Sequence, residues 1–234
     1  MSVMAAIPVQ SATQTVTQAA AWAQTLGLPR IDAQVLLLHA LGRAPHDRAW
    51  LLAHGDDVLD ATVQATFAAN TQRRLDTEPV AYITGHKEFF GLTLHVDARV
   101  LDPRADTETL VEWALSCLAD VPTPEVIDLG TGSGAIALAL KHSRPDATVS
   151  AVDASADALA VASANAKRLE LSVAFHQGSW LSPIDTHTFD AIVSNPPYVA
   201  SDDAHLAALK HEPLSALASG PDGLDDIRTI VRQA

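Results

Sequence analysis

The stretch at residues 125–140, EVIDLGTGSGAIALAL, joins a short apolar segment to a helical pattern through three closely spaced glycines. A buried strand followed at once by a helix is the first half of a strand–helix–strand unit. Glycines between the two elements allow a tight turn and let a ligand approach the backbone closely. The stretch therefore predicts a parallel sheet with a ligand-binding loop at its edge.

The same alternation continues toward the C-terminus. TVSAVD (148–153), SVAFHQG (172–178) and FDAIVSN (189–195) are typical of strands, and SADALAVASANAKRLE (155–170) is typical of a helix. A further helix is expected from about Leu224. Short apolar strands that alternate with helices predict an α/β domain whose parallel sheet has helices on both faces.

The N-terminal part follows a different pattern. Residues 11–75 contain apolar residues at helical spacing, which predicts four short helices in a small bundle. Two short alternating segments around Gly91 predict a hairpin, and Asp106 is the expected N-cap of a helix that runs to about Leu118. We therefore expect a helical domain at residues 1–76, a hairpin-containing connector at 77–105 and the α/β domain at 106–234.

Composition limits the classes of function. The chain of 234 residues has 48% hydrophobic and 18% charged residues, which is typical of globular proteins, and a formal net charge of −13. This charge disfavours a broad nucleic-acid surface. No apolar run reaches the ~18–20 residues that cross a bilayer. A single cysteine, Cys117, fits a reducing cytoplasm, and no Cys/His spacing indicates a metal site.

The glycine loop alone leaves two ligands open. Gly130, Gly132 and Ala135 also fit a dinucleotide fingerprint, and Asp153, at the end of the next strand, suits a ribose in either ligand. Asp128 directly precedes the glycines, and its carboxylate would repel a pyrophosphate but attract a cation. S-adenosylmethionine carries a sulfonium and an ammonium group and no phosphate, so the loop favours this methyl donor.

Asn195-Pro196-Pro197-Tyr198 follows the fourth strand of the α/β domain. Proline has no N–H, so two prolines in succession offer carbonyl acceptors without competing donors. The Asn195 side-chain carbonyl adds another acceptor, and Tyr198 can cover a planar group. This combination predicts a catalytic site that binds both N–H bonds of a planar nitrogen, such as a carboxamide or the amino group of a base.

These motifs resemble those of the seven-strand methyltransferases that use S-adenosylmethionine. The resemblance implies a Rossmann-like class I methyltransferase domain, in which Gly130, Thr131, Gly132, Ser133 and Gly134 surround the amino-acid end of the donor. It also implies that Asp153 binds the ribose, that Asn195 lies beside the donor, and that Trp180 stacks on the adenine. The alternative for Trp180 is an aromatic residue that packs at the end of a strand.

Several stretches outside the catalytic loop resemble the peptide-chain release factor glutamine methyltransferases. They are EPVAYITG (78–85), KEFFG (87–91), PRADTE (103–108), DLGTGSGAIALAL (128–140), VSNPPY (193–198) and HEPLSAL (211–217). The resemblance implies that the helical domain docks a release factor, and that Asn195–Tyr198 bind the glutamine of its Gly-Gly-Gln loop. Phe89, Arg104 and Glu108 would lie around the pocket, although packing and capping are equally open for them.

Three positions depart from this family's pattern. Asp102 stands where an apolar residue is usual, Ala105 replaces a common proline, and Ser179 replaces an aspartate that contacts adenine. The resemblance also calls for roughly three more strands, on the order of 40–50 residues, beyond residue 234. We therefore expect the sequence to be a piece of a longer protein.

The resemblance implies a cytoplasmic enzyme with release factors as partners and S-adenosylmethionine as donor. It implies no metal, no membrane and no direct nucleic-acid binding. Two alternatives stay open at this point. One is an amino-methyltransferase that acts on a base of nucleic acid, and the other is an inactive fragment that binds only the donor.

Overall fold

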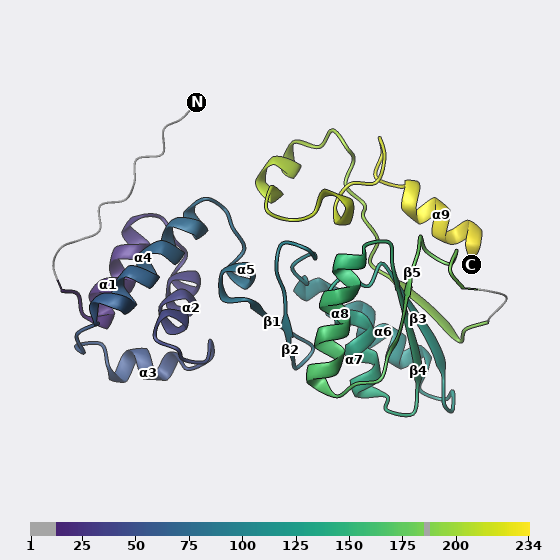
Figure 1. The fold of residues 1–234 in the computed structure, drawn as a ribbon, viewed down its shortest axis with the longest axis horizontal. Helices are drawn as coiled ribbons and strands as arrows, with labels where there is room; N and C mark the ends of the chain where they lie inside the picture. The colour runs from purple at the N-terminus through teal and green to yellow at the C-terminus, as the bar shows by residue number, and fades with distance from the viewer. Residues whose placement is uncertain (1–12, 185–187) are drawn as a thin grey trace. The chain divides into compact units, whose positions relative to one another are not determined.

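The computed structural model describes residues 13–184 and 188–234. The chain divides into two compact units, one ending at Thr84 and the other running from Gly85 to Ala234 (Figure 1). Each unit has its own buried core, and the two are described separately below.

The first unit is a bundle of short helices. They are α1 (Val16–Thr25), α2 (Arg30–Ala40), α3 (Arg48–Ala53), α4 (Ala61–Leu75) and α5 (Val80–Thr84). Thr15 begins α1 with a capping box, and the Asp60 side chain accepts a hydrogen bond from the Val63 N–H at the start of α4. Leu36, Leu37 and Phe67 are almost fully buried between these helices. The expected bundle of short helices is confirmed, and α5 adds a fifth helix in the range 77–105 that was expected to be a connector.

The second unit is built on a four-stranded parallel sheet. Its strands are β3 (Glu125–Leu129), β4 (Thr148–Asp153), β5 (Ala174–Gln177) and β6 (Ala191–Ser194), in the order β5-β4-β3-β6. The helices of this unit are α6 (Glu108–Cys117), α7 (Ala135–Ser143), α8 (Ala156–Leu169) and α9 (Asp225–Gln233) (Figure 1). The sequence-based prediction of an α/β, Rossmann-like domain behind a helical bundle is confirmed.

The two faces of the sheet are covered by different parts of the chain. Because side chains alternate along a strand, Val149 and Ala151 share one face, where they pack with Ala137 of α7. Ile127 and Leu129 share the opposite face, where Ile230 of α9 packs against them. Asp128 points toward the α7 face, since it lies between these two residues on β3.

Strand register aligns the carboxyl ends of the strands. Leu129 pairs with Val152 on one side and with Ser194 on the other, so the residues that follow β3, β4 and β6 lie at one level. The chain order reverses between β3 and β6, because β4 and β5 lie on one side of β3 and β6 on the other. In open α/β sheets, ligands bind beyond the carboxyl ends of the strands at this switch point.

A two-stranded hairpin precedes the sheet. Strands β1 (His86–Phe89) and β2 (Leu92–His95) pair antiparallel around a two-residue turn. Phe90 and Gly91 in this turn both have positive φ, 50° and 76°, as a type I′ turn requires. The expected hairpin is confirmed, and Phe90 and Gly91 form its turn.

The segment before α6 differs from the sequence-based expectation. Asp106 lies inside a 3₁₀ turn, η1 (Ala105–Thr107), and α6 begins at Glu108 with Thr107 as its N-cap. Asp106 therefore does not cap the helix. This single 3₁₀ turn precedes α6. Sequence propensities do not distinguish a 3₁₀ turn from the first turn of an α-helix.

Asn165 on α8 joins the hairpin to the glycine loop (Gly130–Gly134). Its side chain is fully buried, and its Oδ1 accepts a hydrogen bond from the His95 N–H at 2.7 Å. Its Nδ2 donates to the His95 carbonyl at 2.9 Å and to the Ser133 carbonyl at 3.0 Å. One amide thus satisfies three backbone groups from two segments that are distant in sequence.

We predict that Asn165→Ala lowers the free energy of unfolding by about 2–4 kcal/mol, because three backbone groups, one buried and two partly buried, lose their partner. Ser163→Ala, at an exposed position of the same helix, should change it by less than about 0.5 kcal/mol. Denaturant unfolding monitored by circular dichroism measures both values. Equal effects of the two substitutions would contradict the bridging role of Asn165.

Candidate active site

The glycine loop follows β3 at the switch point. The N–H groups of Gly130 and Thr131 both donate to the Val152 carbonyl, at 2.9 and 3.0 Å, which folds the loop over the end of β4. Gly130 has a φ of 73°, and a Cβ at this position would lie 3.2 Å from the Trp180 ring. The backbone conformation favours glycine there, and a Cβ would require the neighbouring ring to shift.

Asp153 closes β4 beside this loop. Its Oδ2 accepts a hydrogen bond from the Gly132 N–H at 2.8 Å, and its Oδ1 accepts one from the Ser155 N–H at 2.9 Å. A carboxylate has about four lone-pair sites, so each oxygen keeps the capacity to accept another hydrogen bond. The side chain is partly exposed, which leaves it accessible to a ligand with hydroxyl donors.

Asp128 lies beneath the glycine loop and is fully buried. Its Oδ2 accepts hydrogen bonds from the Thr131 hydroxyl at 2.6 Å and from the Ala137 N–H at 3.2 Å. Among the described residues, none donates a hydrogen bond to its Oδ1. The carboxyl group therefore supports the loop from below and keeps one oxygen unpaired.

Burial raises the pKa of Asp128 to about 7, because desolvation disfavours the charged form. The hydrogen bonds from Thr131 and Ala137 oppose this shift, and the negative charge of Asp153 adds to it. A cation near the loop would stabilise the Asp128 carboxylate and lower its pKa again. The electrostatics of the loop thus favour a positively charged ligand.

Trp180 lies against the glycine loop and the sheet. Its backbone has a φ of 53°, and its ring packs with the cluster of Ile127, Leu129 and Val152 while remaining partly exposed. The ring therefore packs against the protein on at least part of its surface. Ser179, directly before it, is exposed.

The segment Asn195–Tyr198, which we call the acceptor clamp, follows β6 at the same level as the glycine loop. The Ser194 hydroxyl donates to the Leu129 carbonyl at 2.7 Å and ties the ends of β6 and β3 together. Asn195 Nδ2 donates to the Thr107 hydroxyl at 3.3 Å, and no hydrogen bond from a described residue reaches its Oδ1. The Tyr198 side chain is 64% exposed.

The three residues expected around the pocket are all engaged in contacts within the protein. Phe89 is buried to 1% exposure in the core of the second unit. Glu108 accepts a hydrogen bond from the Phe90 N–H at 3.1 Å, so it fixes the hairpin turn to the start of α6. Arg104 donates to both carboxylate oxygens of Glu212, at 2.7 and 2.9 Å.

Arg104 and Glu212 belong to a cluster of four charged residues. Asp102 lies 3.1 Å from the Lys87 ammonium and 3.7 Å from the Arg104 guanidinium, and Glu212 is almost fully buried. The aspartate at position 102 thus has two cationic partners, which explains why a charged residue is tolerated where an apolar one was expected. The cluster connects the hairpin to the segment that follows the acceptor clamp.

Sequence reasoning missed the contacts of three residues that shape the site: Thr107, Asn165 and Glu212. Glu212 lies in the stretch HEPLSAL, but its partner Arg104 is 108 residues away in sequence. Thr107 and Asn165 also act on segments 88 and 70 residues away. No local pattern identifies such contacts.

We predict that Asp128→Asn gains stability relative to the parent protein as the pH rises from 4 to 7. The unfolded carboxyl loses its proton near pH 4 while the folded one retains it to about pH 7. The parent therefore loses stability across this window, by up to about 4 kcal/mol, and the amide variant does not. Unfolding free energies measured at several pH values test this.

Asp146→Asn is the matched control, because Arg144 lowers the pKa of Asp146 to about 2. Its contribution to stability is present above pH 4 and is lost only as the pH falls toward 2. The difference between this variant and the parent should therefore stay constant from pH 4.5 to 8. An Asp128→Asn difference that is equally flat would show that Asp128 ionises normally.

Two family models match the chain. The model described as "Methyltransferase small domain" matches residues 106–216, and the one described as "PrmC N-terminal domain" matches residues 13–85. A solved structure of the hMettl16 catalytic domain in complex with an RNA hairpin is similar with a TM-score of 0.51. That likeness covers 71% of this chain and 61% of the other at 14% identity, so it supports the fold alone.

Curated relatives carry the name release factor glutamine methyltransferase. The protein of Xylella fastidiosa (strain Temecula1) is 48% identical over 215 residues, which are 91% of this chain and 77% of the relative. The protein of Coxiella burnetii is 45% identical over 88% of this chain and 74% of its own length. The protein of Escherichia coli (strain K12) is 44% identical, also over 88% of this chain and 74% of its own length.

Identity of this extent, over both units and about three quarters of each relative, is enough to assign the family. In the part of the chain that the structure describes, no helix is long and apolar enough to cross a membrane. Within the same residues no group of His, Cys, Asp and Glu is placed to hold a metal ion. The chain belongs to the release factor glutamine methyltransferases, which use S-adenosylmethionine as methyl donor.

Proposed function

We propose that this chain transfers the methyl group of S-adenosylmethionine to the side-chain amide nitrogen of the glutamine in the Gly-Gly-Gln loop of peptide chain release factors. The observation that carries the proposal is the acceptor clamp, which presents an unengaged Asn195 Oδ1 at the level of the glycine loop. A primary amide has two N–H bonds on one planar nitrogen, and a clamp of acceptors matches them.

The glycine loop has the properties that the donor requires. Its backbone is open at Gly132, where nothing lies within 4 Å of an added Cβ, and the unpaired Asp128 Oδ1 lies beneath it. We assign Gly130–Gly134 to the amino-acid end of the donor, Asp153 to its ribose and Trp180 to its adenine. When bound, S-adenosylmethionine supplies a methyl group on a positively charged sulfur.

The Asp128 carboxylate contributes to this site through charge rather than through direct contact. Its Oδ2 is committed to Thr131 and Ala137, and the whole residue is shielded from solvent. A buried negative charge beneath the loop attracts the cationic donor, because little water screens the interaction.

The acceptor clamp activates the amide nitrogen by orientation and polarisation. Asn195 Oδ1 and the Pro196 carbonyl accept hydrogen bonds from the two N–H groups, and this shifts electron density onto the nitrogen as it bonds to the methyl carbon. The bond from that carbon to sulfur breaks, its electron pair stays on the now neutral sulfur, and the nitrogen loses one N–H proton to solvent. Pro196 and Pro197 keep the loop rigid, since their φ is fixed. Tyr198 covers the planar amide. In-line placement of the nitrogen against the methyl group supplies much of the rate acceleration.

Thr107 determines which way the Asn195 side chain faces. Because Asn195 Nδ2 donates to the Thr107 hydroxyl, its Oδ1 is directed away from that contact and remains available. Phe89, Arg104 and Glu108 complete the proposed pocket. Their buried or paired contacts favour a role in shaping its wall rather than in chemistry.

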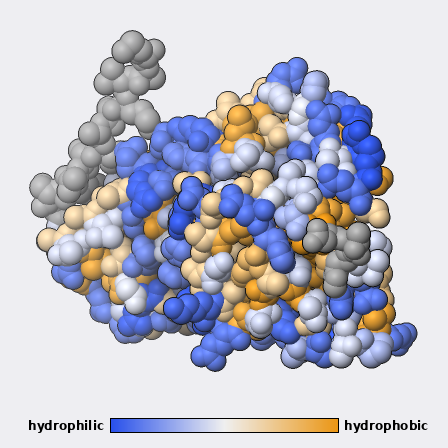
Figure 2. Space-filling view, turned by 45° about the vertical axis from the view of Figure 1, so that its right-hand side comes forward, coloured by the Kyte–Doolittle hydropathy of each residue, from blue (hydrophilic) through white to orange (hydrophobic). Residues whose placement is uncertain are grey.

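The helical domain, proposed at residues 1–76, docks the release factor, and the connector at 77–105 links it to the methyltransferase domain at 106–234. Hydrophobic residues reach the surface in several areas (Figure 2), and Tyr198 and Leu214, both after β6, are more than 60% exposed. A protein loop suits such a surface better than nucleic acid does, as does the net charge of −13. We place the reaction in the cytoplasm, without a membrane or direct nucleic-acid binding.

We predict that Asn195→Ala lowers kcat on a purified release factor by at least about 100-fold, because the amide loses its side-chain acceptor. The Kd for S-adenosylmethionine should change by less than threefold. Labelled methyl transfer, mapped by mass spectrometry, and calorimetric titration of the donor measure the two quantities. A large loss of donor affinity would mean that Asn195 serves the donor instead.

Tyr198 offers a matched pair of variants in the same assay. Tyr198→Phe keeps the ring and should retain most of the activity, whereas Tyr198→Ala should lose about tenfold or more. Label on ribosomal RNA or DNA instead of the release factor would support a base methyltransferase. Donor binding without any transfer would leave an inactive donor-binding protein.

We further predict that donor binding at pH 7 releases a fraction of a proton from Asp128, because the cation lowers the raised pKa of this group. The binding enthalpy should therefore differ between phosphate and Tris buffers, which differ in their enthalpy of ionisation. Asp128→Asn should remove the difference. Equal enthalpies for the parent protein in both buffers would contradict the charge argument.

A further inference from the structure

The backbone at Gly223 lies directly against the acceptor clamp. A Cβ at Gly223 would fall 2.3 Å from the Tyr198 carbonyl oxygen and 2.9 Å from its carbonyl carbon, closer than any side chain allows. It would also lie 3.3 Å from the Ala200 nitrogen. Gly223 has a φ of 77°, so both its backbone conformation and its surroundings require glycine.

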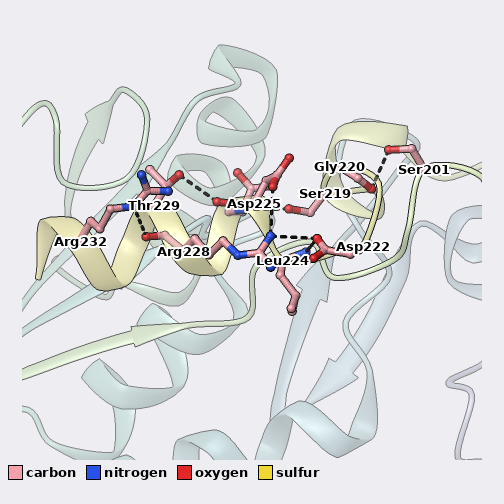
Figure 3. Close-up of polar contacts among 10 residues, drawn as sticks. Ser201, Ser219, Gly220, Asp222, Leu224, Asp225, Arg228, Thr229 and Arg232 are labelled. Carbon is pink, nitrogen blue, oxygen red and sulfur yellow. Dashed lines mark hydrogen bonds and ion pairs between the residues drawn. The ribbon is translucent and has the colours of Figure 1, made fainter.

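Hydrogen bonds join the same two segments on either side of this contact. The Val199 N–H donates to the Leu217 carbonyl at 2.9 Å, and the Ser219 N–H donates to the Val199 carbonyl at 2.9 Å. The N–H and hydroxyl of Ser201 both donate to the Gly220 carbonyl, at 2.9 and 3.0 Å (Figure 3). The residues after the clamp are therefore paired with the turn at Ser219–Gly223, which we call the supporting turn.

Charged residues brace the supporting turn against α9. Arg228 donates to both carboxylate oxygens of Asp222, at 2.7 and 3.0 Å, and also to Asp225 at 3.4 Å (Figure 3). The Ser219 hydroxyl accepts a hydrogen bond from the Asp226 N–H at 2.8 Å. The first turn of α9 and the supporting turn thus form one connected unit.

Helix α9 connects this unit to the donor side of the site. Ile230 packs on Leu129 and its neighbours, the same apolar cluster on which Trp180 packs, and the Trp180 ring lies against Gly130. The Gln233 side chain also accepts a hydrogen bond from the Leu181 N–H at 2.9 Å. One segment therefore contacts the surroundings of the glycine loop at one end and the acceptor clamp at the other.

We propose that Gly223 is a positioning residue, and that the supporting turn sets the distance between the acceptor clamp and the glycine loop. Because the turn touches the Tyr198 backbone and is anchored through α9 to the Trp180 cluster, it holds the end of the clamp at Tyr198, whereas β6 holds the end at Asn195. The inference rests on the proposed function, since it assigns the clamp to the amide that receives the methyl group.

Gly223→Ala tests the proposal. The added methyl group must push the Tyr198 backbone away, and a misplacement of about 1 Å costs on the order of 100-fold in rate. We expect kcat to fall at least about tenfold, while the Kd for S-adenosylmethionine stays within twofold. A purely structural role would instead lower the melting temperature and weaken donor binding together with kcat.

Gly42→Ala is the control for backbone strain. Gly42 has a φ of 67°, close to that of Gly223, and nothing lies within 4 Å of an added Cβ. Its melting temperature should fall through the same conformational strain, whereas kcat at saturating release factor should stay within twofold of the parent. A kcat loss equal to that of Gly223→Ala would overturn the proposal.

Arg228→Ala tests the brace without a steric clash, which keeps the proposal testable if Gly223→Ala fails to fold. Arg228 is about half exposed, and its loss frees Asp222 and loosens the turn. We expect kcat to fall about threefold or more, with the donor Kd unchanged. Arg232→Ala, also on α9 but bonded only to the Arg228 carbonyl by the contacts described, should leave kcat unchanged.

Hydrogen exchange separates this inference from the proposed function. The Ser201 amide donates to Gly220 in the supporting turn, and the Val199 amide donates to Leu217, two residues before that turn, so both should exchange about tenfold faster in Gly223→Ala and in Arg228→Ala. Peptides covering the glycine loop should exchange at the parental rate. This result needs no substrate, so it stands even if the parent protein proves inactive on release factors.

Two further outcomes would overturn the proposal. One is unchanged exchange at Val199 and Ser201 in both variants, and the other is an active parent whose folded variants both keep kcat within twofold. An inactive parent with faster exchange in the variants would remove the proposed function and leave the structural link between the supporting turn and the clamp.

Discussion

The register of β3 with its two neighbours is the constraint on which the site depends. Leu129 pairs with Val152 and with Ser194, so three strands end at one level and deliver Gly130, Asp153 and Asn195 to the same edge. A slip of one residue in β6 would turn Val193 out of the core and move the Asn195 side chain to the other face. The Ser194 hydroxyl donates a hydrogen bond to the Leu129 carbonyl and so opposes such a slip directly before Asn195.

The protein tolerates electrostatic strain close to this register. Asp128 lies in the middle layer of the sheet with one oxygen unpaired, and its burial disfavours the charged form. An apolar residue there would avoid the cost of desolvating a carboxylate, but it would leave the Thr131 hydroxyl and the Ala137 N–H without their acceptor. The loop is thus supported by a carboxylate whose charged form is stabilised by a nearby positive charge. S-adenosylmethionine carries such a charge.

Much of the architecture was predictable because its signals are local. An apolar run predicts the strand at 125–129, and the glycines after it and the two prolines at 196 and 197 each predict a turn. The predicted elements match the observed ones within a few residues. One failure was local, since Asp106 has the residue type of an N-cap but falls inside η1. The others were long-range, because the pairing of Arg104 with Glu212 and the contact of Gly223 with Tyr198 depend on segments that only the fold brings together.

The acceptor clamp also determines which side chains the proposed site would exclude. In the proposed function, Asn195 Oδ1 and the Pro196 carbonyl present oxygen atoms to the incoming side chain, and the prolines have no backbone N–H groups that could lie among them. A glutamate side chain is almost the same size as glutamine, yet its ionised carboxylate would bring oxygen against oxygen and would lose its hydration without any replacement. The proposed site would therefore distinguish the amide from its deamidated product because only the amide donates hydrogen bonds. A pocket that matched only the size of the side chain would not achieve this.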